Sequence, residues 1–446
     1  MAFIAFDIGS GSIRCALAEE DGRFELFDRA ATPVHRTADA GVEIDGEEVC
    51  ETVLRMVARA SRKRARRIRG LGFSCLGSAF VPVGPSGEAI GHALSPLDAR
   101  PPVVPPADLA ADDLYRRTGQ NPHAMSSLYQ LRYLVDSADH SLAGTTSFLS
   151  LRGLLVARLC GVRVEDHSWA SRTMLYDWRA GDWADDLLAY AGVSRTQMPQ
   201  IVESTRALPI LPQRAGELGL DTDAVAIVGG LDNCCAVAAA GADPRTLVNI
   251  SGTFEHLSAV VPGAAVPAFV PDAEAFAFRS VRPDEAVACS RSTTGRALER
   301  LLAAGTTTGD YLERGVTPGP DRTGPRPELE VARLLDRGCF EMRRFLDAYE
   351  RAAEPVGAIL VVGGGARGTA ALQRKANVLG RRLLVATRSE ASLDGALRLT
   401  RLALDGTMGH DVEAPRSVTS APIVEPHPDL HAAFEPYYKE FIANGS

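Results

Sequence analysis

The sequence predicts an α/β protein with two domains, and three observations support this fold class. The chain has 446 residues, which is too long for one ordinary hydrophobic core. Segments typical of strands alternate with segments typical of helices along much of the chain. A strand–turn–strand unit with a turn of Gly, Ser or Thr opens each half, which suggests a duplicated architecture.

In the first half, the predicted elements begin with a strand hairpin. Met1–Asp7 and Ile13–Ala18 are apolar and rich in β-forming residues, and a Gly/Ser turn joins them. The patterns that follow predict helices over 47–69, 130–136 and 147–159, strands over 70–74 and 224–228, and a helix after Asp232. The prolines and polar residues of 208–223 indicate a boundary, so we expect domains at 1–223 and 224–446.

In the second half, Thr246–Ile250 and Phe254–Val261 read as strands on either side of the turn Ser251-Gly252-Thr253. The remaining patterns predict helices over 294–303, 329–353, 369–379 and 393–405, and strands over 356–362 and 382–386.

Composition narrows the class of protein. The apolar fraction of 46% and charged fraction of 23% are typical of a globular enzyme, and the net charge of −8 disfavours nucleic-acid binding. No segment approaches the roughly 20 apolar residues of a membrane span. Asp7 interrupts the apolar N-terminus, so we expect no signal peptide. Eight scattered cysteines without a CxxC pair favour a reduced, cytoplasmic setting.

The turn Asp7-Ile8-Gly9-Ser10-Gly11-Ser12-Ile13-Arg14 is the first candidate site. A turn of Gly and Ser leaves backbone N–H groups free to approach phosphate oxygens. Ser10 and Ser12 can add hydroxyl contacts and Arg14 a positive charge. Asp7, at the end of a strand, can hold Mg²⁺ through water. The alternative is that these residues form an ordinary glycine-rich hairpin without a ligand.

The second candidate is Gly229-Gly230-Leu231-Asp232-Asn233, in which a carboxylate follows a strand and opens an apolar helix. Asp232 could take the proton of an attacking hydroxyl. Phosphoryl transfer needs one such carboxylate beside its nucleophile. The alternative is a helix N-cap, where Asp is common.

Two further segments carry weaker signals. Gly363-Gly364-Gly365-Ala366 follows a buried strand and precedes a helix, so its backbone can approach a flat or phosphorylated ligand, or can be a plain connection. Asp98 and Arg100 lie two apart on an extended segment and therefore point the same way. They could contact polyol hydroxyls or form a structural ion pair. The chain has neither G-x-G-x-x-G spacing at these glycines nor a G-x-x-x-x-G-K-[ST] motif.

In their order along the chain, these segments resemble the FGGY family of carbohydrate kinases. The resemblance rests on D-x-G-S-x-S-x-R from residue 7, G-G-x-D-N at 229–233, S-G-T at 251–253 and G-G-G-A at 363–366, and it covers essentially the whole chain. It implies two actin-like domains of the ribonuclease-H type with an ATP and sugar cleft between them.

The resemblance also implies residue roles. Asp232 would be the catalytic base, Asn233 would touch the sugar and Asp7 would organise Mg²⁺. The phosphates of ATP would be held by Gly9, Ser10, Gly11, Ser12 and Arg14 and, from the opposite side, by Gly252 and Thr253. Gly364, Gly365 and Ala366 would pack on the adenosine. Domain closure would exclude water.

The chain differs from many family members in the segments that determine which sugar is bound. Cys75-Leu76-Gly77-Ser78 replaces a Met-His-Gly run, and no Trp precedes Asp98-Ala99-Arg100. We therefore expect Cys75, Leu76, Asp98 and Arg100 beside Asn233 in the substrate site, with the sugar itself left open and a pentulose or hexulose favoured.

The expected activity is ATP- and Mg²⁺-dependent phosphorylation of a small sugar or polyol. The alternative is a non-catalytic, actin-like nucleotide-binding regulatory protein, against which the carboxylate of Asp232 argues. The sequence does not determine the oligomeric state, and a homodimer is one of the states it allows.

Overall fold

The computed structural model describes residues 2–19, 24–63, 68–107, 109–137, 142–241, 245–252, 254–263, 275–303, 327–353, 355–387, 390–405 and 422–444. It confirms the α/β class. The described chain forms two compact units, one containing Met1–Ala239, Ala277–Ala286 and Ser392–His410, the other Ala240–Phe276, Val287–Ala391 and Asp411–Ser446. No helix in the described ranges is long and apolar enough to cross a membrane.

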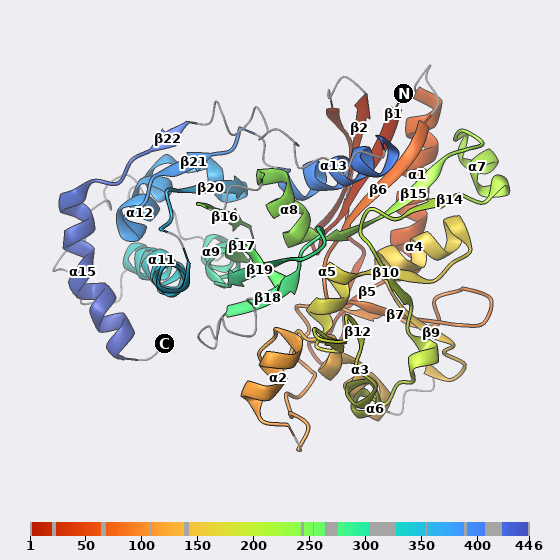
Figure 1. Ribbon diagram of the computed structural model, residues 1–446, viewed down its shortest axis with the longest axis horizontal. Helices are drawn as coiled ribbons and strands as arrows, with labels where there is room; N and C mark the ends of the chain where they lie inside the picture. The colour runs from red at the N-terminus through yellow and green to blue at the C-terminus, as the bar shows by residue number, and fades with distance from the viewer. Residues whose placement is uncertain are drawn as a thin grey trace. The chain divides into compact units, whose positions relative to one another are not determined.

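The first unit is built on a six-stranded sheet in the order β14-β15-β6-β1-β2-β3 (Figure 1). β1 pairs antiparallel with β2 and parallel with β6, and β6 pairs parallel with β15. The strands are β1 Ala2–Ile8, β2 Ser12–Glu19, β3 Phe24–Ala31, β6 Ile68–Cys75, β14 Ala207–Pro209 and β15 Val225–Leu231. The predicted N-terminal hairpin is therefore confirmed.

Both faces of this sheet are covered, since every residue of β1 is buried. Ile4, Phe6 and Ile8 face a large core that includes side chains of α1 Gly46–Lys63 and α4 Leu151–Cys160. Phe3 and Ala5 face α13 Ala391–Asp405, which lies next to β1, β2 and β6 in Figure 1. A helix from the last part of the chain thus completes the first unit.

Smaller elements surround this sheet. A three-stranded sheet has the order β4-β5-β8, and β7 pairs with β9, β10 with β13, and β11 with β12. The strands are β4 Val34–Arg36, β5 Val42–Ile44, β7 Phe80–Val83, β8 Ala93–Leu94, β9 Ser147–Ser150, β10 Val164–Asp166, β11 Tyr176–Asp177, β12 Asp182–Trp183 and β13 Gln200–Val202. The helices are α2 Ala111–Thr118, α3 Ser127–Asp136, α5 His167–Ala170, α6 Asp185–Ala191, α7 Pro212–Leu218 and α8 Asp232–Ala240, with short turns η2 Ser171–Thr173 and η3 Arg195–Gln197.

The second unit contains most of a seven-stranded sheet in the order β18-β19-β17-β16-β20-β21-β22. β16 pairs antiparallel with β17 and parallel with β20, repeating the pairing of β1 with β2 and β6. The strands are β16 Thr246–Ser251, β17 Glu255–Pro262, β18 Ala275–Arg279, β19 Glu285–Ser290, β20 Ala358–Gly363, β21 Leu383–Val385 and β22 Ile423–Val424. The helices are α9 Thr294–Ala303, α11 Pro327–Ala352, α12 Thr369–Leu379 and α15 Pro428–Ala443, with the turn η5 Gly364–Arg367.

Three expectations need correction. The predicted helix over 147–159 begins as strand β9, because Ser150 is the N-cap whose hydroxyl accepts a hydrogen bond from Gly153 N–H. The helix predicted to reach residue 69 ends earlier, since α1 ends at Lys63 and β6 begins at Ile68. The domain boundary expected after residue 223 falls too early, because β15 pairs with β6 and the first unit continues to Ala239.

Candidate active site

Asp7 lies at the centre of the first sheet, at the end of β1. Strand register sets it opposite Arg14 on β2 and Ser74 on β6. Its side chain is buried, accepts a hydrogen bond from Ser74 Oγ at 2.9 Å and forms an ion pair with Arg14 Nη2. Arg14, expected to meet phosphate, thus holds the Asp7 carboxylate in this structure.

The turn between β1 and β2 is closed by its own backbone. Gly9 N–H donates to Ser12 O at 3.1 Å, and Thr32 Oγ1 donates to Gly9 O at 2.6 Å. A Cβ atom at Gly11 would meet no heavy atom within 4 Å within the described structure, so the tip of the turn has open space around it. Gly9 N–H is thus used within the turn, and phosphate binding by the turn stays a prediction.

Asp232 follows β15 and opens α8, and its environment changes its acidity. Burial first, and then the negative charge of Asp7, raise the pKa of Asp232 to about 7, against the opposing effect of Asn233 N–H and the guanidinium groups of Arg172 and Arg14. The N–H of Asn233 donates to Asp232 Oδ1 at 2.7 Å. A carboxylate with a pKa near neutrality is suited to accept a proton at physiological pH.

The local backbone explains how Asp232 reaches this position. Gly229 has φ +76°, and a Cβ atom there would lie 1.7 Å from Phe73 O. Only glycine tolerates both conditions. The register of β15 against β6 shifts at the same point, between Ile227 and Gly230. The glycine pair that the sequence analysis noted is therefore a bulge that redirects the strand just before Asp232.

Asn233 is the sequence-predicted substrate residue whose environment fits a ligand best. The residue is 8% exposed, and neither Oδ1 nor Nδ2 has a hydrogen-bond partner among the described residues. A buried amide normally has such partners. A bound hydroxyl would satisfy it.

Cys75 and Leu76, by contrast, are core residues. They are 0% and 3% exposed, and both belong to the main hydrophobic cluster of the first unit. Burial raises the pKa of the Cys75 thiol to about 12. The backbone of Leu76 is fixed at both ends, since its N–H donates to Ile8 O and its O accepts from Trp169 Nε1. Substrate contact by these two side chains stays a prediction.

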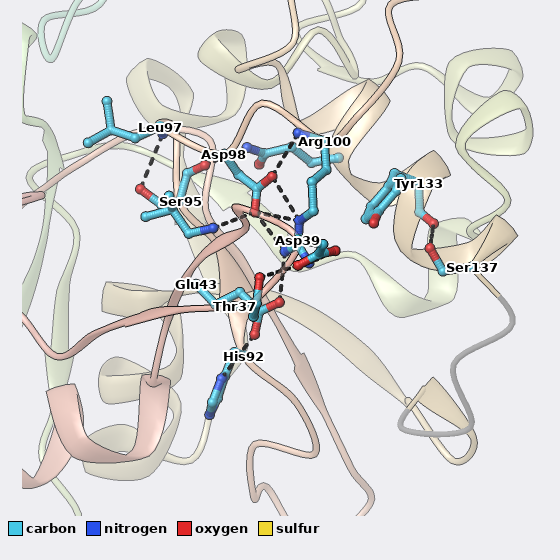
Figure 2. A network of polar contacts seen from close by, with 12 residues as sticks. Thr37, Asp39, Glu43, His92, Ser95, Leu97, Asp98, Arg100, Tyr133 and Ser137 are labelled. Atoms are coloured by element: carbon cyan, nitrogen blue, oxygen red, sulfur yellow. Dashed lines mark hydrogen bonds and ion pairs between the residues drawn. The ribbon is translucent and has the colours of Figure 1, made fainter.

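Asp98 and Arg100 brace each other, which was one of the two alternatives (Figure 2). Asp98 Oδ2 accepts from Val42 N–H at 2.9 Å and from Arg100 Nη2 at 2.7 Å. Arg100 also pairs with Glu43 and Asp39 and stacks over the Tyr133 ring. Asp98 is buried, and this network ties the loop after β8 to β5.

One polar cluster lies beside this network. Ligand atoms of His35, Asp45 and His92 lie within 4.8 Å of one another. His92 Nδ1 is 3.2 Å from Glu43 Oε2, and its Nε2 is 3.8 Å from Asp45 Oδ2. The His35 ring stacks on that of His92 with centroids 4.8 Å apart, so ring stacking and ion pairs hold the cluster together.

Several polar residues of the first unit carry no signal in the sequence pattern. Arg172 Nη1 lies 3.2 Å from His123 Nε2 and 3.5 Å from Gln120 Oε1, and its guanidinium stacks on Phe278. Ser127 Oγ donates to Ser78 O, which sets α3 against the turn that follows β6. The buried hydroxyls of Ser78, Ser126 and Tyr129 have no hydrogen-bond partner in the described part of the chain. The partners of Arg172 and Ser127 come from distant parts of the chain, so the sequence pattern alone does not separate these residues from other polar residues.

In the second unit, the two predicted nucleotide turns lie side by side. Ser251 at the end of β16 pairs with Gly363 at the end of β20. A Cβ atom at Gly365 would lie 1.9 Å from Ser251 Oγ, and one at Gly363 would lie 2.5 Å from Ser251 O. Gly252, Gly364 and Gly365 are not buried, and Ala366 belongs to η5. Thr253 lies outside the described residues.

A buried ion pair supports these turns. Lys375 Nζ pairs with Glu255 and donates to Asn249 Oδ1 at 2.6 Å, so α12 is tied to β16 and β17. Burial alone would raise the pKa of Glu255, but the charge of Lys375 and hydrogen bonds hold that pKa below its usual value. The low pKa of the buried Glu255 carboxyl therefore depends on the charge of Lys375.

These sites belong to a known class of protein. The chain matches the N-terminal domain of the FGGY family of carbohydrate kinases over residues 2–239 and the C-terminal domain of that family over residues 305–404. It belongs to the FGGY family of carbohydrate kinases.

Particular relatives are similar over part of their length. Rhamnulokinase of Yersinia pestis (strain Pestoides F) is 32% identical over 199 residues, which are 43% of this chain and 40% of that protein. Gluconokinase of Bacillus subtilis (strain 168) is 20% identical over 234 residues, 51% of this chain and 46% of that protein. The chain thus matches less than half the length of these curated relatives.

Solved structures show the same fold over the whole chain. The gluconate kinase of Lactobacillus acidophilus has a TM-score of 0.85 at 16% identity, covering 99% of this chain and 97% of that one. The structure titled a xyloylose kinase from Brucella ovis has a TM-score of 0.85 at 20% identity, covering 100% and 98%. The protein therefore has the two-domain, actin-like fold of these sugar kinases.

Proposed function

We propose that the protein transfers a phosphoryl group from ATP to a hydroxyl of a small sugar or polyol, with Asp232 as general base. The observation that carries the proposal is Asp232 itself. It is a carboxylate with a pKa near 7, located in the same unit as the Asp7 turn and directly after a glycine bulge. A regulatory nucleotide-binding protein would have no need of this group.

In this proposal the chain's own residues align the acceptor and remove its proton. Asp232 accepts the hydroxyl proton while Asn233 bonds a neighbouring hydroxyl. Asp7 would hold Mg²⁺, which supplies charge neutralisation for the phosphates. The turns at Gly9–Ser12 and Gly252, with Thr253, would bind phosphate through backbone N–H groups, and Gly364–Ala366 would pack on the adenosine.

The acceptor proposed is a polyhydroxylated sugar, a pentulose or hexulose first. Relatives named rhamnulokinase and structures titled xylulose kinase favour this class. The unpartnered buried hydroxyls of Ser78, Ser126 and Tyr129, like the amide of Asn233, suit a ligand with several hydroxyl groups. A gluconate-type sugar acid is the next candidate, since relatives of that name are also similar.

A coupled ADP-release assay over ketoses, aldoses, polyols and sugar acids tests the proposal. We expect turnover with at least one ketose, and we expect Asp232→Asn to lower kcat by about 1000-fold or more with ATP binding retained. Asp223→Asn is the matched control, because it makes the same change at an exposed carboxylate of the same unit. Folded protein that binds ATP but phosphorylates no acceptor would instead favour the regulatory alternative.

A further inference from the structure

The short helix α5 is preceded by a buried carboxylate that gathers hydrogen bonds. Asp166 is fully buried and accepts from Arg152 Nη2 at 2.8 Å, from Ser204 Oγ at 2.7 Å and from Ser168 Oγ at 2.5 Å. The backbone N–H of Ser168 also donates to Asp166 Oδ2, at 2.9 Å. A carboxylate only accepts hydrogen bonds. The Ser168 hydroxyl proton must therefore point to Asp166.

This orientation leaves an oxygen lone pair of Ser168 for a second partner. Leu231 N–H donates to Ser168 Oγ at 2.9 Å. Leu231 is the last residue of β15 and directly precedes Asp232. The side chain of Ser168 thus holds the backbone immediately before the proposed base.

The pairing of β15 is irregular just before this contact. The register against β6 shifts between Ile227 and Gly230, and Gly229 has φ +76°. A bulge of this kind interrupts the ladder and leaves backbone groups to find other partners. A Cβ atom at Gly230 would lie 3.1 Å from Ser168 Oγ, so the hydroxyl sits directly against the bulge.

The same helix also holds the neighbouring strand end. Trp169 is fully buried, and its Nε1–H donates to Leu76 O at 2.8 Å, just past the end of β6. Two consecutive residues of α5 therefore bond to the ends of two adjacent strands, and Asp232 follows one of them.

We propose that Ser168, oriented by Asp166, is a positioning residue for the phosphoryl-transfer step. It touches no reacting atom. It sets the direction in which β15 leaves the sheet and thereby the place of the Asp232 carboxylate. The inference rests on the proposed function, since it assigns Ser168 a purpose only if Asp232 is the base. A displacement of about 1 Å in such a group can cost about 100-fold in rate.

Ser168→Ala and Ser204→Ala form a matched pair of variants. Both remove a buried serine hydroxyl that donates to the same oxygen, Asp166 Oδ2. Only Ser168 also accepts from Leu231 N–H, while Ser204 contacts β15 through its backbone O, which accepts from Gly229 N–H and survives the substitution. A general loss of stability would affect both variants alike.

Steady-state kinetics with the acceptor found by the substrate screen tests the inference. We expect Ser168→Ala to lower kcat about 100-fold with KM for ATP within about twofold, and Ser204→Ala to stay within about fivefold of wild type. Ser168→Thr keeps the hydroxyl and should restore most of kcat. Equal losses in the two alanine variants, or an unchanged kcat in Ser168→Ala, would overturn the inference.

Two further results keep the test decisive. If Ser168→Ala does not fold, Ser168→Cys, which retains a weak acceptor of similar size, should give a kcat between those of wild type and the Asp232→Asn protein, and a wild-type kcat there would refute the role. If wild-type protein turns over no acceptor, the proposed function itself fails. Turnover that Asp232→Asn abolishes but Ser168→Ala leaves intact rejects the positioning role alone.

Discussion

At the scale of single residues, the acidity of Asp232 sets a pH dependence. The base works only when deprotonated, and its pKa is about 7 because burial and the charge of Asp7 disfavour the carboxylate. We expect kcat/KM for the acceptor to fall about tenfold per pH unit below about pH 7 and to level off above it. Initial rates across this range measure it. A flat profile through neutrality would contradict the assignment.

The same group affects stability with a defined sign. The pKa of Asp232 is raised from 3.8 to about 7, so the folded chain binds more protons than the unfolded chain between these values. Folding stability contributed by this group is therefore lost as pH rises through that interval. We expect Asp232→Asn to melt at a higher temperature than wild type at about pH 8, with a smaller difference at about pH 5. Asp223→Asn should show no such trend in the same thermal melts, since that carboxylate is exposed.

At the scale of elements, strands β16 and β17 depend on an ion pair with α12. Lys375 is 7% exposed and Glu255 6% exposed. Removing the lysine therefore leaves a buried carboxylate without its cation. We expect Lys375→Met to cost about 3–5 kcal/mol of unfolding free energy in denaturant titrations. Lys439→Met is the control, because Lys439 makes an exposed ion pair within one helix. Similar losses of unfolding free energy in the two variants would show that the buried ion pair stabilises the fold no more than an exposed one.

Element boundaries show where sequence patterns are insufficient. The hairpin of β1 and β2 and the helix α9 were predictable because their patterns are local. The strand β9 was missed, since Ser147–Ser150 continues directly into an apolar helix and only pairing with β7 makes it a strand. The glycines at 229 and 230 were predicted to lie between a strand and a helix, but the bulge there follows from the pairing of β15 with β6, which brings Gly229 against the backbone of Phe73.

At the scale of the whole molecule, α13 joins the last part of the chain to the first sheet. A Cβ atom at Gly72 on β6 would lie 1.7 Å from Thr400 Oγ1 and 3.0 Å from Ala396 O on α13. We expect Gly72→Ala to lower the unfolding free energy by about 1–3 kcal/mol through overpacking. Thr400→Ala removes the nearest atom, so the double variant should recover part of this loss in denaturant titrations. Additive losses would mean that the two positions do not meet.

The sequence by itself determined the α/β class, the paired strand–turn–strand units and the order of motifs that indicates the family. Each strand, turn and motif is a local pattern of residue type and spacing, and the order of the motifs can be followed along the chain without knowing which of them meet in space. Folding decided which polar residues act together, because it depends on strand register and on helices that arrive from distant parts of the chain. Asp98 and Arg100 therefore became a brace, Cys75 and Leu76 became core, and Ser168 came to lie against the backbone of Leu231.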